Sequence, residues 1–225
     1  MRNLGLALLG ELTAQHAPIH FLMTHFHWDH IQGIPFFVPL YNPANEIVFH
    51  SPRPSGDIRE ILEGQMTYPY FPVRFEQLAA RREFALIPAE GMQQGKLTIR
   101  PFPMNHPQGA SGYRLELDGA VIVHASDCEH GDAELDKVLR EYARDADVLI
   151  YDAQYTPQEY EVKKAWGHST WLEGVRVARD ANAKRLVLFH HDPAHNDEFL
   201  TNLVAEARSE FENTDAAKEG WSIKL

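Results

Sequence analysis

The chain has 225 residues, of which 44% are hydrophobic, and its 21 basic and 32 acidic residues give a net charge of −11. This predicts a single domain, residues 1–225, with one buried core, and argues against a protein that grips long nucleic acid through its phosphates. One cysteine, Cys128, excludes an internal disulfide and is typical of the reducing cytoplasm; no apolar run approaches the ~20 residues of a membrane span, so no membrane partner is expected.

The predicted elements begin with an apolar run at residues 4–9. It lacks the length and cleavage site of a signal peptide, and we interpret it as the end of a buried element that closes on Gly10. Residues 19–24 (IHFLMT) are typical of a short buried strand. Further strands are predicted at 46–50, 83–88, 96–101, 112–117, 120–125, 148–151, 185–189 and 221–225, and helices at 57–65, 133–143, 169–180 and 197–211.

Two local signals refine this list. Asp118-Gly119 predicts a tight hairpin turn, because both residue types readily adopt positive φ angles. The segment 33–75 is rich in proline and aromatic residues, and it either forms the rim of a pocket or is a connection packed on the core. The order of elements, a run of strands followed by β-α-β-α, predicts a layered α/β sandwich.

The strongest motif is His25-x-His27-x-Asp29-His30, which directly follows the first predicted strand. It places four potential metal ligands within six residues. In a tight loop after a strand, alternate side chains can turn toward one point. The first two histidines can then bind one ion while the last two residues bind another. Imidazole and carboxylate ligands suit Zn²⁺, with Mn²⁺ and Fe²⁺ left open.

Two ions need further ligands from downstream segments. The candidates are His106, Asp127 and His190, and each lies just beyond the C-terminal end of a predicted apolar strand. Strand ends that cluster at one sheet edge are where such sites are built. Taken singly, each candidate is more often an ordinary loop residue than a ligand. In combination with the first motif, they favour a metal site.

The whole pattern resembles the metallo-β-lactamase superfamily, whose signature is His-x-His-x-Asp-His followed by a lone His, an Asp and a final His. The resemblance covers nearly the whole chain and implies an αββα sandwich, with mixed sheets flanked by helices and the first N-terminal strands missing. It implies three ligands for a first divalent ion, His25, His27 and His106. It implies three for a second, Asp29, His30 and His190, with Asp127 bridging the two ions. His191 and Cys128 receive no role.

A second pair of residues narrows the resemblance to ribonuclease Z and related phosphodiesterases. In that branch an acidic residue after a strand orients the histidine of a His-Ser-Thr loop. Asp152 and the loop Gly167-His168-Ser169-Thr170 match this pattern, which implies that Asp152 holds His168 and that His168 contacts a phosphate. A cationic imidazole there would stabilise charge on phosphate oxygens, and a carboxylate partner would fix its tautomer. A purely structural loop before a helix stays open as the alternative.

Two features depart from ribonuclease Z. That enzyme carries a long tRNA-gripping arm between the lone His and the bridging Asp, whereas His106 and Asp127 are only 21 residues apart. The strands and glycine-rich turn that usually precede the His motif are also expected to be missing here, because only 24 residues precede His25. With the acidic charge, the short spacing favours a small or cyclic phosphodiester as substrate and argues against long nucleic acid as a partner. A homodimer is left open.

The resemblance therefore implies a dinuclear phosphodiesterase, in which a metal-bridging hydroxide attacks phosphorus, Asp29 steers the proton of the nucleophile and His168 neutralises the transition state. The main alternative is a hydrolase of carboxylic esters, lactones or thioesters on the same metal site, which does not need the His168 cation. A diiron oxygen- or nitric-oxide-reducing module ranks lower, because such modules have Glu where this chain has His27. The intact ligand set argues against a non-catalytic sensor domain.

Overall fold

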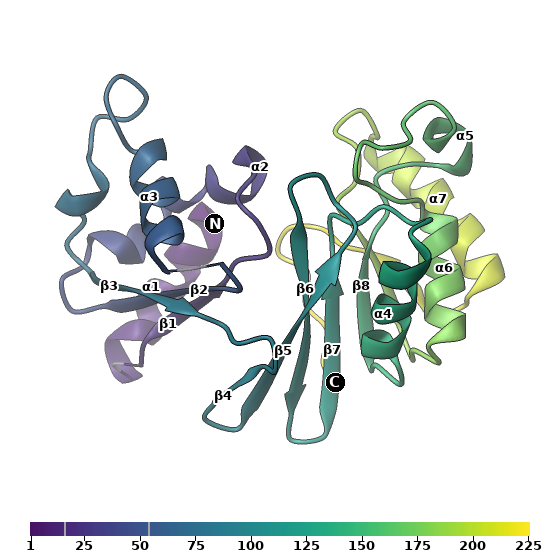
Figure 1. Ribbon diagram of the computed structural model, residues 1–225, viewed down its shortest axis with the longest axis horizontal. Coiled ribbons are helices and arrows are strands. Elements are labelled where there is room, and N and C mark those ends of the chain that lie inside the picture. The colour runs from purple at the N-terminus through teal and green to yellow at the C-terminus, as the bar shows by residue number, and fades with distance from the viewer. Residues whose placement is uncertain (16, 54) are drawn as a thin grey trace. The chain divides into compact units, whose positions relative to one another are not determined.

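The computed structural model describes residues 1–15, 17–53 and 55–225. The chain divides into two compact units, Met1–Pro88 and Ala89–Leu225. Each unit has its own sheet and its own hydrophobic core (Figure 1). Within the described residues, no helix is long and apolar enough to cross a membrane.

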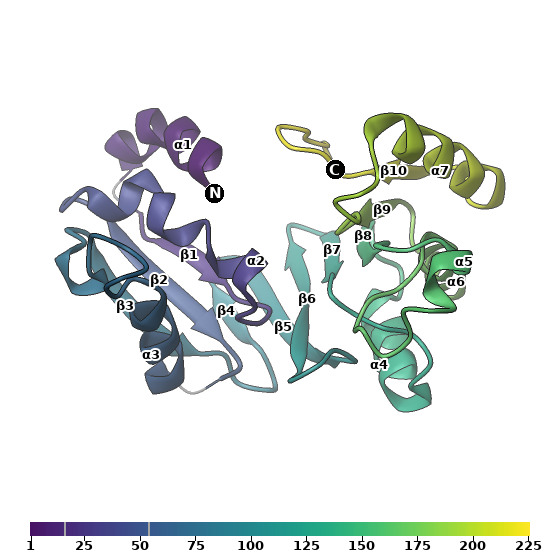
Figure 2. The same cartoon turned by 90° about the horizontal axis from the view of Figure 1, so that it is seen from above.

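The first unit is built on a three-stranded parallel sheet in the order β1-β2-β3. Its strands are β1 (Ile19–Leu22), β2 (Glu46–Ser51) and β3 (Arg81–Leu86). Its helical elements are α1 (Arg2–Gln15), α2 (Trp28–Ile31), η1 (Ile34–Phe36), η2 (Val38–Tyr41), α3 (Ser55–Gln65) and η3 (Phe75–Gln77) (Figure 2). Alternate side chains of a strand face opposite sides of a sheet. Ile47 and Phe49 of β2 therefore share a face, and they belong to one core with Ile58 and Leu62 of α3.

The N-terminal segment is a helix, so the prediction of a buried element closing on Gly10 was wrong. α1 continues through that position to Gln15, and Leu4, Leu6 and Leu9 are exposed. The helix contacts the rest of the first unit at Gly5, which is buried. A Cβ atom on Gly5 would lie 3.0 Å from side-chain atoms of Phe37 and Pro39, so a small residue lets the helix approach the η2 segment closely.

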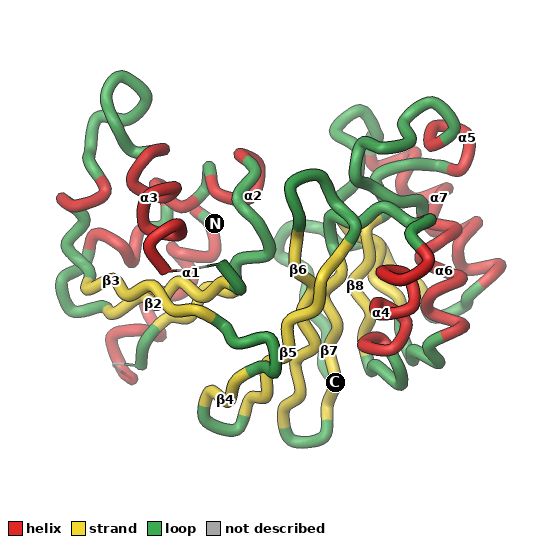
Figure 3. The backbone as a smooth tube through the Cα atoms, in the orientation of Figure 1, coloured by secondary structure: helices red, strands yellow, loops and turns green. Residues whose placement is uncertain are grey.

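The second unit holds a mixed seven-stranded sheet in the order β10-β9-β8-β7-β6-β5-β4. Figure 3 labels β4 to β8 of this sheet. Its strands are β4 (Met92–Gln94), β5 (Leu97–Met104), β6 (Ala110–Leu117), β7 (Ala120–Ala125), β8 (Val148–Asp152), β9 (Leu186–Phe189) and β10 (Thr214–Ala216). Pairing is antiparallel from β4 to β7 and parallel from β7 to β10. Helices α4 (Ala133–Ala143), α6 (Trp171–Asp180) and α7 (Asp197–Glu210) pack on this sheet, and a short helix, α5 (Pro157–Tyr160), follows β8.

Capping and apolar spacing explain why α4 and α6 form where they do. The Asp132 side chain caps α4 by accepting the N–H groups of Glu134 and Leu135, and the Thr170 hydroxyl caps α6 in the same way. Such a cap contributes about 1 kcal/mol. α6 buries Trp171, Val175 and Ala178 at helical spacing against the sheet. The predicted hairpin turn is also confirmed, since Asp118 and Gly119 have φ angles of 48° and 88°.

Five strands of the second unit, β5, β7, β8, β9 and β10, point in the same direction. Two successive antiparallel pairings restore the direction of β5 in β7, and β8, β9 and β10 run parallel to β7. The pairing register places the C-terminal ends of β7, β8 and β9 side by side, because Ala125 of β7 is paired with Tyr151 of β8, and Tyr151 with Leu188 of β9. The residues that follow these strands therefore emerge at one edge of the sheet.

Most predicted strands and helices are present within a few residues of their expected bounds. The predicted last strand at 221–225 is wrong: these residues have no strand structure. The strand that pairs with β9 at this end of the sheet is Thr214–Ala216 instead. The observed folding units are mixed α/β, with sheets flanked by helices, as predicted.

Candidate metal centre

The His25-x-His27-x-Asp29-His30 motif of the first unit gathers its side chains after β1. His25 is buried, and its ring centroid lies 4.5 Å from that of His27 and 4.2 Å from that of His30. His27 is the N-cap residue of α2, and this short helix carries both Asp29 and His30. A carboxylate oxygen of Asp29 lies 3.1 Å from Nε2 of His30. The motif is thus compact, as its spacing predicted.

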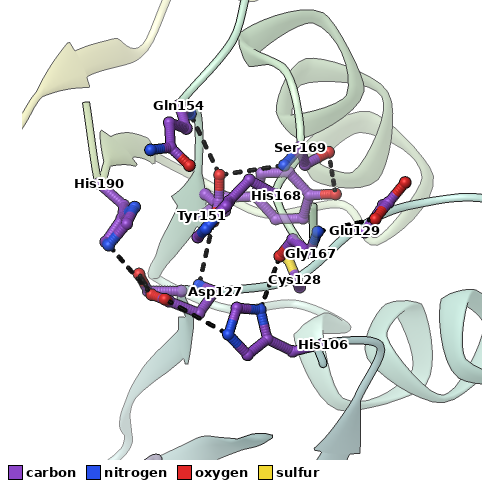
Figure 4. Close-up of polar contacts among 12 residues, drawn as sticks. His106, Asp127, Cys128, Glu129, Tyr151, Gln154, Gly167, His168, Ser169 and His190 are labelled. Atoms are coloured by element: carbon purple, nitrogen blue, oxygen red, sulfur yellow. Dashed lines mark hydrogen bonds and ion pairs between the residues drawn. The ribbon is translucent and has the colours of Figure 1, made fainter. Parts of the chain in front are cut away.

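The strand ends of the second unit bring five of the predicted site residues together (Figure 4). They are His106 after β5, Asp127 after β7, Asp152 at the end of β8, His168 before α6 and His190 after β9. Potential ligand atoms of His106, Asp127 and His168 all lie within 4.8 Å of one another, as do those of Asp152, His168 and His190. One edge of one sheet therefore concentrates imidazole and carboxylate groups.

The buried carboxylate of Asp127 faces a different histidine with each oxygen. Oδ2 lies 3.9 Å from Nε2 of His106, and Oδ1 lies 3.5 Å from Nε2 of His190. Both distances exceed the 2.7–3.2 Å of an N–H···O hydrogen bond. Two ligand atoms that share a Zn²⁺ ion, each about 2.0–2.2 Å from it, are about 3.3 to 3.8 Å apart. The spacing to His190 lies inside that range, so Asp127 and His190 fit a shared cation as they stand, whereas the spacing to His106 slightly exceeds it.

The backbone at two of these positions is held in an unusual conformation. Asp127 and His190 have φ angles of 62° and 56°, in the left-handed region that non-glycine residues seldom adopt. The N–H of Asp127 donates to Oδ2 of Asp152 at 3.1 Å, and the Ser126 hydroxyl donates to Oδ1 of Asp127 at 2.9 Å. Such strain persists where surrounding contacts fix it, and it clusters at functional sites.

His106 is held in one tautomer by a backbone carbonyl. Its Nδ1 lies 2.8 Å from the carbonyl oxygen of Gly167. A carbonyl can only accept, so Nδ1 carries the hydrogen and the lone pair of Nε2 is directed to the Asp127 side. Orientation of a ligating histidine by its other nitrogen is general at metal sites. Gly167 has a φ of 90°, and a Cβ there would lie 2.5 Å from Nδ1 of His106.

The hydrogen bond expected between Asp152 and His168 is present. Nδ1 of His168 lies 2.8 Å from Oδ2 of Asp152, whose carboxylate is wholly buried and also accepts the N–H of Ser169. The His168 ring stacks on that of His190 with centroids 4.8 Å apart, and it meets the His106 ring at a steep angle at 5.3 Å. The contact is observed, whereas the catalytic role of the pair stays a prediction.

The Cys128 thiol, next to the site, is suited to neither ligation nor nucleophilic attack. Burial, with a smaller contribution from Asp152, raises the pKa of the Cys128 thiol well above its usual value, so the sulfur stays protonated and unreactive. Burial also lowers the pKa of His191. Among the residues that the structure describes, neither belongs to a cluster of potential metal ligands.

Sequence reasoning missed the residues that support the ligands. Glu129 accepts the backbone N–H groups of Ala165 and Gly167, and Ser126 donates to Asp127. No spacing rule distinguishes them from loop residues. Gly167 was noted as part of a motif, but its need for glycine depends on the close approach of His106, which the sequence does not show.

Comparisons with known proteins agree with this geometry. The family model described as beta-lactamase superfamily domain matches residues 9–191. Ribonuclease Z of Geobacillus kaustophilus is 26% identical and is aligned over 92% of this chain and 80% of its own length; ribonuclease Z of Bacillus thuringiensis is 35% identical over 55% of this chain and 44% of its own length.

Solved structures show the same fold. The metallo-beta-lactamase fold protein YhfI from Bacillus subtilis has a TM-score of 0.69 at 21% identity, covering 96% of this chain and 82% of that one. A diphosphatase of the PhnP family has a TM-score of 0.63 at 20% identity, covering 92% and 71%. The chain therefore belongs to the metallo-β-lactamase superfamily, in the branch of metal-dependent hydrolases that includes ribonuclease Z.

Proposed function

We propose that this hydrolase is a phosphodiesterase that uses two divalent metal ions to cleave a small or cyclic phosphodiester. The observation that carries the proposal is the placement of His168. Its Nδ1 is bonded to a buried carboxylate, and its ring lies against the rings of His106 and His190. An imidazole so oriented, beside the predicted ligands, is suited to contact an anionic substrate.

The proposed metal ligands are those that the family signature implies. His25, His27 and His106 would hold one ion, and Asp29, His30 and His190 the other, with Asp127 between them. Support comes from the spacing around the Asp127 carboxylate and from the fixed tautomer of His106. Zn²⁺ suits this mixed imidazole and carboxylate set, and Mn²⁺ and Fe²⁺ are chemically compatible.

The reaction divides between the ions and the side chains of the protein. When bound, a pair of divalent ions lowers the pKa of a water and neutralises charge on phosphate oxygens. Asp152 holds the His168 ring beside those of His106 and His190, where a protonated imidazole would stabilise the charge that develops on phosphate oxygens. Asp29 lies on the surface of α2, where its carboxylate can accept a proton from the nucleophile.

The proposed substrate is small because the chain has no segment suited to grip RNA between His106 and Asp127. That stretch is fully described, and it forms the β6–β7 hairpin with a two-residue turn at Asp118-Gly119. The net charge of −11 also weakens attraction for a long polyanion. The ribonuclease Z relatives make an RNA substrate the alternative that a test must include.

The test is hydrolysis of bis(p-nitrophenyl) phosphate by Zn²⁺-loaded protein, compared with the His168→Ala variant. We expect turnover by the wild type and a loss of at least tenfold in the variant, or ~1.4 kcal/mol of transition-state stabilisation, with metal content unchanged. Lys164→Ala is the control, since this residue lies in the same segment and its side chain is 57% exposed. It should retain full activity.

Other outcomes identify other functions. If protein with two bound ions cleaves carboxylic esters or thioesters but no phosphodiester, the ester-hydrolase alternative replaces the proposal. If it cleaves a tRNA precursor faster than any small phosphodiester, the proposed substrate class is wrong while the phosphodiesterase chemistry stands. Equal activity of wild type and His168→Ala would remove the role assigned to the histidine.

A further inference from the structure

Glu129 lies in the loop between β7 and α4, and the proposed reaction gives it no part. Its backbone N–H donates to the carbonyl oxygen of Asn105 at 2.8 Å, and the Asn105 amide donates to the Glu129 carbonyl at 3.0 Å. Asn105 immediately precedes His106. The backbone of Glu129 is therefore fixed to the loop that carries one of the predicted metal ligands.

The carboxylate of Glu129 binds a second loop, residues 160–167 (Figure 4). Oε2 accepts the N–H of Gly167 at 2.8 Å, and Oε1 accepts the N–H of Ala165 at 2.7 Å and the hydroxyl of Tyr160 at 2.9 Å. Ala165 and Gly167 have φ angles of 68° and 90°, and a non-glycine residue is disfavoured in this region. Hydrogen bonds to a carboxylate are stronger than those between neutral groups, so these three contacts hold a loop that is otherwise strained.

Gly167 connects this contact to the ligand cluster. Its N–H donates to Glu129, while its carbonyl oxygen accepts from Nδ1 of His106 at 2.8 Å. The next residue along the chain is His168, which is bonded to Asp152. A change in the position of the Gly167 peptide would therefore alter the hydrogen bond that fixes the His106 tautomer, and it would move the residue that precedes His168.

We propose that Glu129 is a positioning residue, which acts through the Gly167 peptide to keep Nε2 of His106 available to a metal ion and His168 in place. Within the described ranges, no cluster of potential ligand atoms includes Glu129, so it acts through its neighbours rather than as a ligand. The part of this inference that concerns His106 needs only metal binding. The part that concerns turnover rests on the proposed function.

The test is the Zn²⁺ affinity of the Glu129→Gln variant, measured by competition with a chromophoric chelator. A glutamine keeps the shape, but its NH₂ group cannot accept, so either Gly167 or Ala165 loses its partner. We expect affinity to fall about 10- to 100-fold, the usual effect of changing a residue that orients a metal ligand. Glu161→Gln is the matched control, because it removes the same charge from a side chain that is 69% exposed and pairs with Lys164, and its affinity should equal that of the wild type.

A second measurement separates positioning from general loosening of the fold. Long-range ¹H–¹⁵N correlation spectra of metal-free protein at about pH 8, where an ordinary imidazole is neutral, report which nitrogen of His106 carries the hydrogen. The wild type and Glu161→Gln should show the Nδ1–H tautomer. Glu129→Gln should show a mixture of the two tautomers, and its kcat for bis(p-nitrophenyl) phosphate should fall more than its KM changes.

Wild-type Zn²⁺ affinity and an unchanged His106 tautomer in folded Glu129→Gln would overturn the proposal. If that variant does not fold, Tyr160→Phe decides the question, since it removes one of the three hydrogen bonds to the carboxylate. We expect it to weaken Zn²⁺ binding by about 3- to 10-fold, and an unchanged affinity would refute the role. If the wild type binds Zn²⁺ but cleaves no phosphodiester, the proposed function fails, while the affinity and tautomer comparisons still decide the role of Glu129.

Discussion

Asp127 combines three properties that are individually uncommon. Its carboxylate is buried, its two oxygens face two different histidines, and its backbone lies in the left-handed region. A buried carboxylate is costly unless hydrogen bonds or cations compensate it. The hydroxyl of Ser126 supplies one hydrogen bond. The distance to His190 leaves room for a shared cation, whose charge would compensate the burial of this carboxylate.

We predict that Asp127→Asn lowers the bound Zn²⁺ from two ions per chain to at most one and removes most of the activity, since the ligands of such a site act as a unit. Asparagine tolerates the left-handed conformation, so the backbone can stay as it is. Metal content after dialysis, measured by atomic emission, tests this. The control is Asp118→Asn, at an exposed turn residue with a φ of 48°. Retention of two ions by Asp127→Asn would show that this carboxylate does not bridge them.

Some residues of the candidate site can be predicted from the sequence, whereas others cannot. His25, His106 and the other candidates are visible because the compact histidine motif and the later residues after apolar strands occur together, although each later residue alone has an ordinary explanation. Ser126 and Glu129 act through hydrogen bonds to the backbone of other loops. Those contacts depend on how loops distant in sequence meet. In the sequence alone, Ser126 and Glu129 cannot be told apart from other polar loop residues.

The segment before α6 packs closely against the loop that carries His106. A Cβ atom on Gly167 would lie 2.3 Å from Cδ of Pro107 and 2.5 Å from Nδ1 of His106. Real Cβ atoms do not approach other atoms so closely, so one of the loops would have to move. The glycine thus allows the His106 loop and the His168 loop to touch.

We predict that Gly167→Ala destabilises the protein by about 1–3 kcal/mol beyond the cost of its φ angle, because the added methyl group overpacks the contact, and that it weakens Zn²⁺ binding. Gly119→Ala is the control. Gly119 has a φ of 88°, close to the 90° of Gly167, but a Cβ there meets nothing within 4 Å. The difference between the urea unfolding midpoints of the two variants measures the cost of the steric clash at Gly167, because the cost of the positive φ angle is common to both. Equal midpoints would mean that the two loops can separate without loss.

Secondary structure elements with a strong local signal were predicted well. α4 spans 133–143 both by prediction and in the structure, because its cap and its apolar spacing are both local. α1 and the 221–225 segment were misjudged because their outcome depends on neighbours. The leucines of α1 resemble a buried run, yet within residues 1–9 the helix buries Gly5 and partly buries Leu8. The strand beside β9 is formed by Thr214–Ala216 and not by the last apolar residues.

At the scale of the whole molecule, the sequence predicted the fold class but not its division into two cores. The run of strands followed by alternating helices and strands indicates layered α/β structure, and the family match across residues 9–191 agrees. The contact pattern separates Met1–Pro88 from Ala89–Leu225. That division reflects contacts between residues far apart in sequence, which periodicity within one element cannot report. The single domain stays a prediction.

The stability of the first unit should depend on pH through a pair of histidines in its sheet. Nδ1 of His20 lies 2.9 Å from Nε2 of His50, and His50 is buried. One ring must donate and the other accept, so the pair holds one hydrogen between these two nitrogens. Burial, and then the neighbouring His20, lower the pKa of His50 below its ordinary value.

The direction of the pH effect follows from linkage. Between the lowered pKa of His50 and about 6.5, the unfolded chain binds a proton that the folded chain excludes, so the free energy of unfolding falls as the pH falls, by up to about 1.4 kcal/mol per unit. We predict that metal-free wild type loses more stability between pH 7.5 and 5.5 than His50→Gln, whose amide stays neutral and can still bond to His20. Histidines that do not touch His50 are common to both proteins and cancel in the difference. Urea midpoints at the two pH values measure it, and parallel losses would show that His50 is protonated as readily in the folded chain as in the unfolded one.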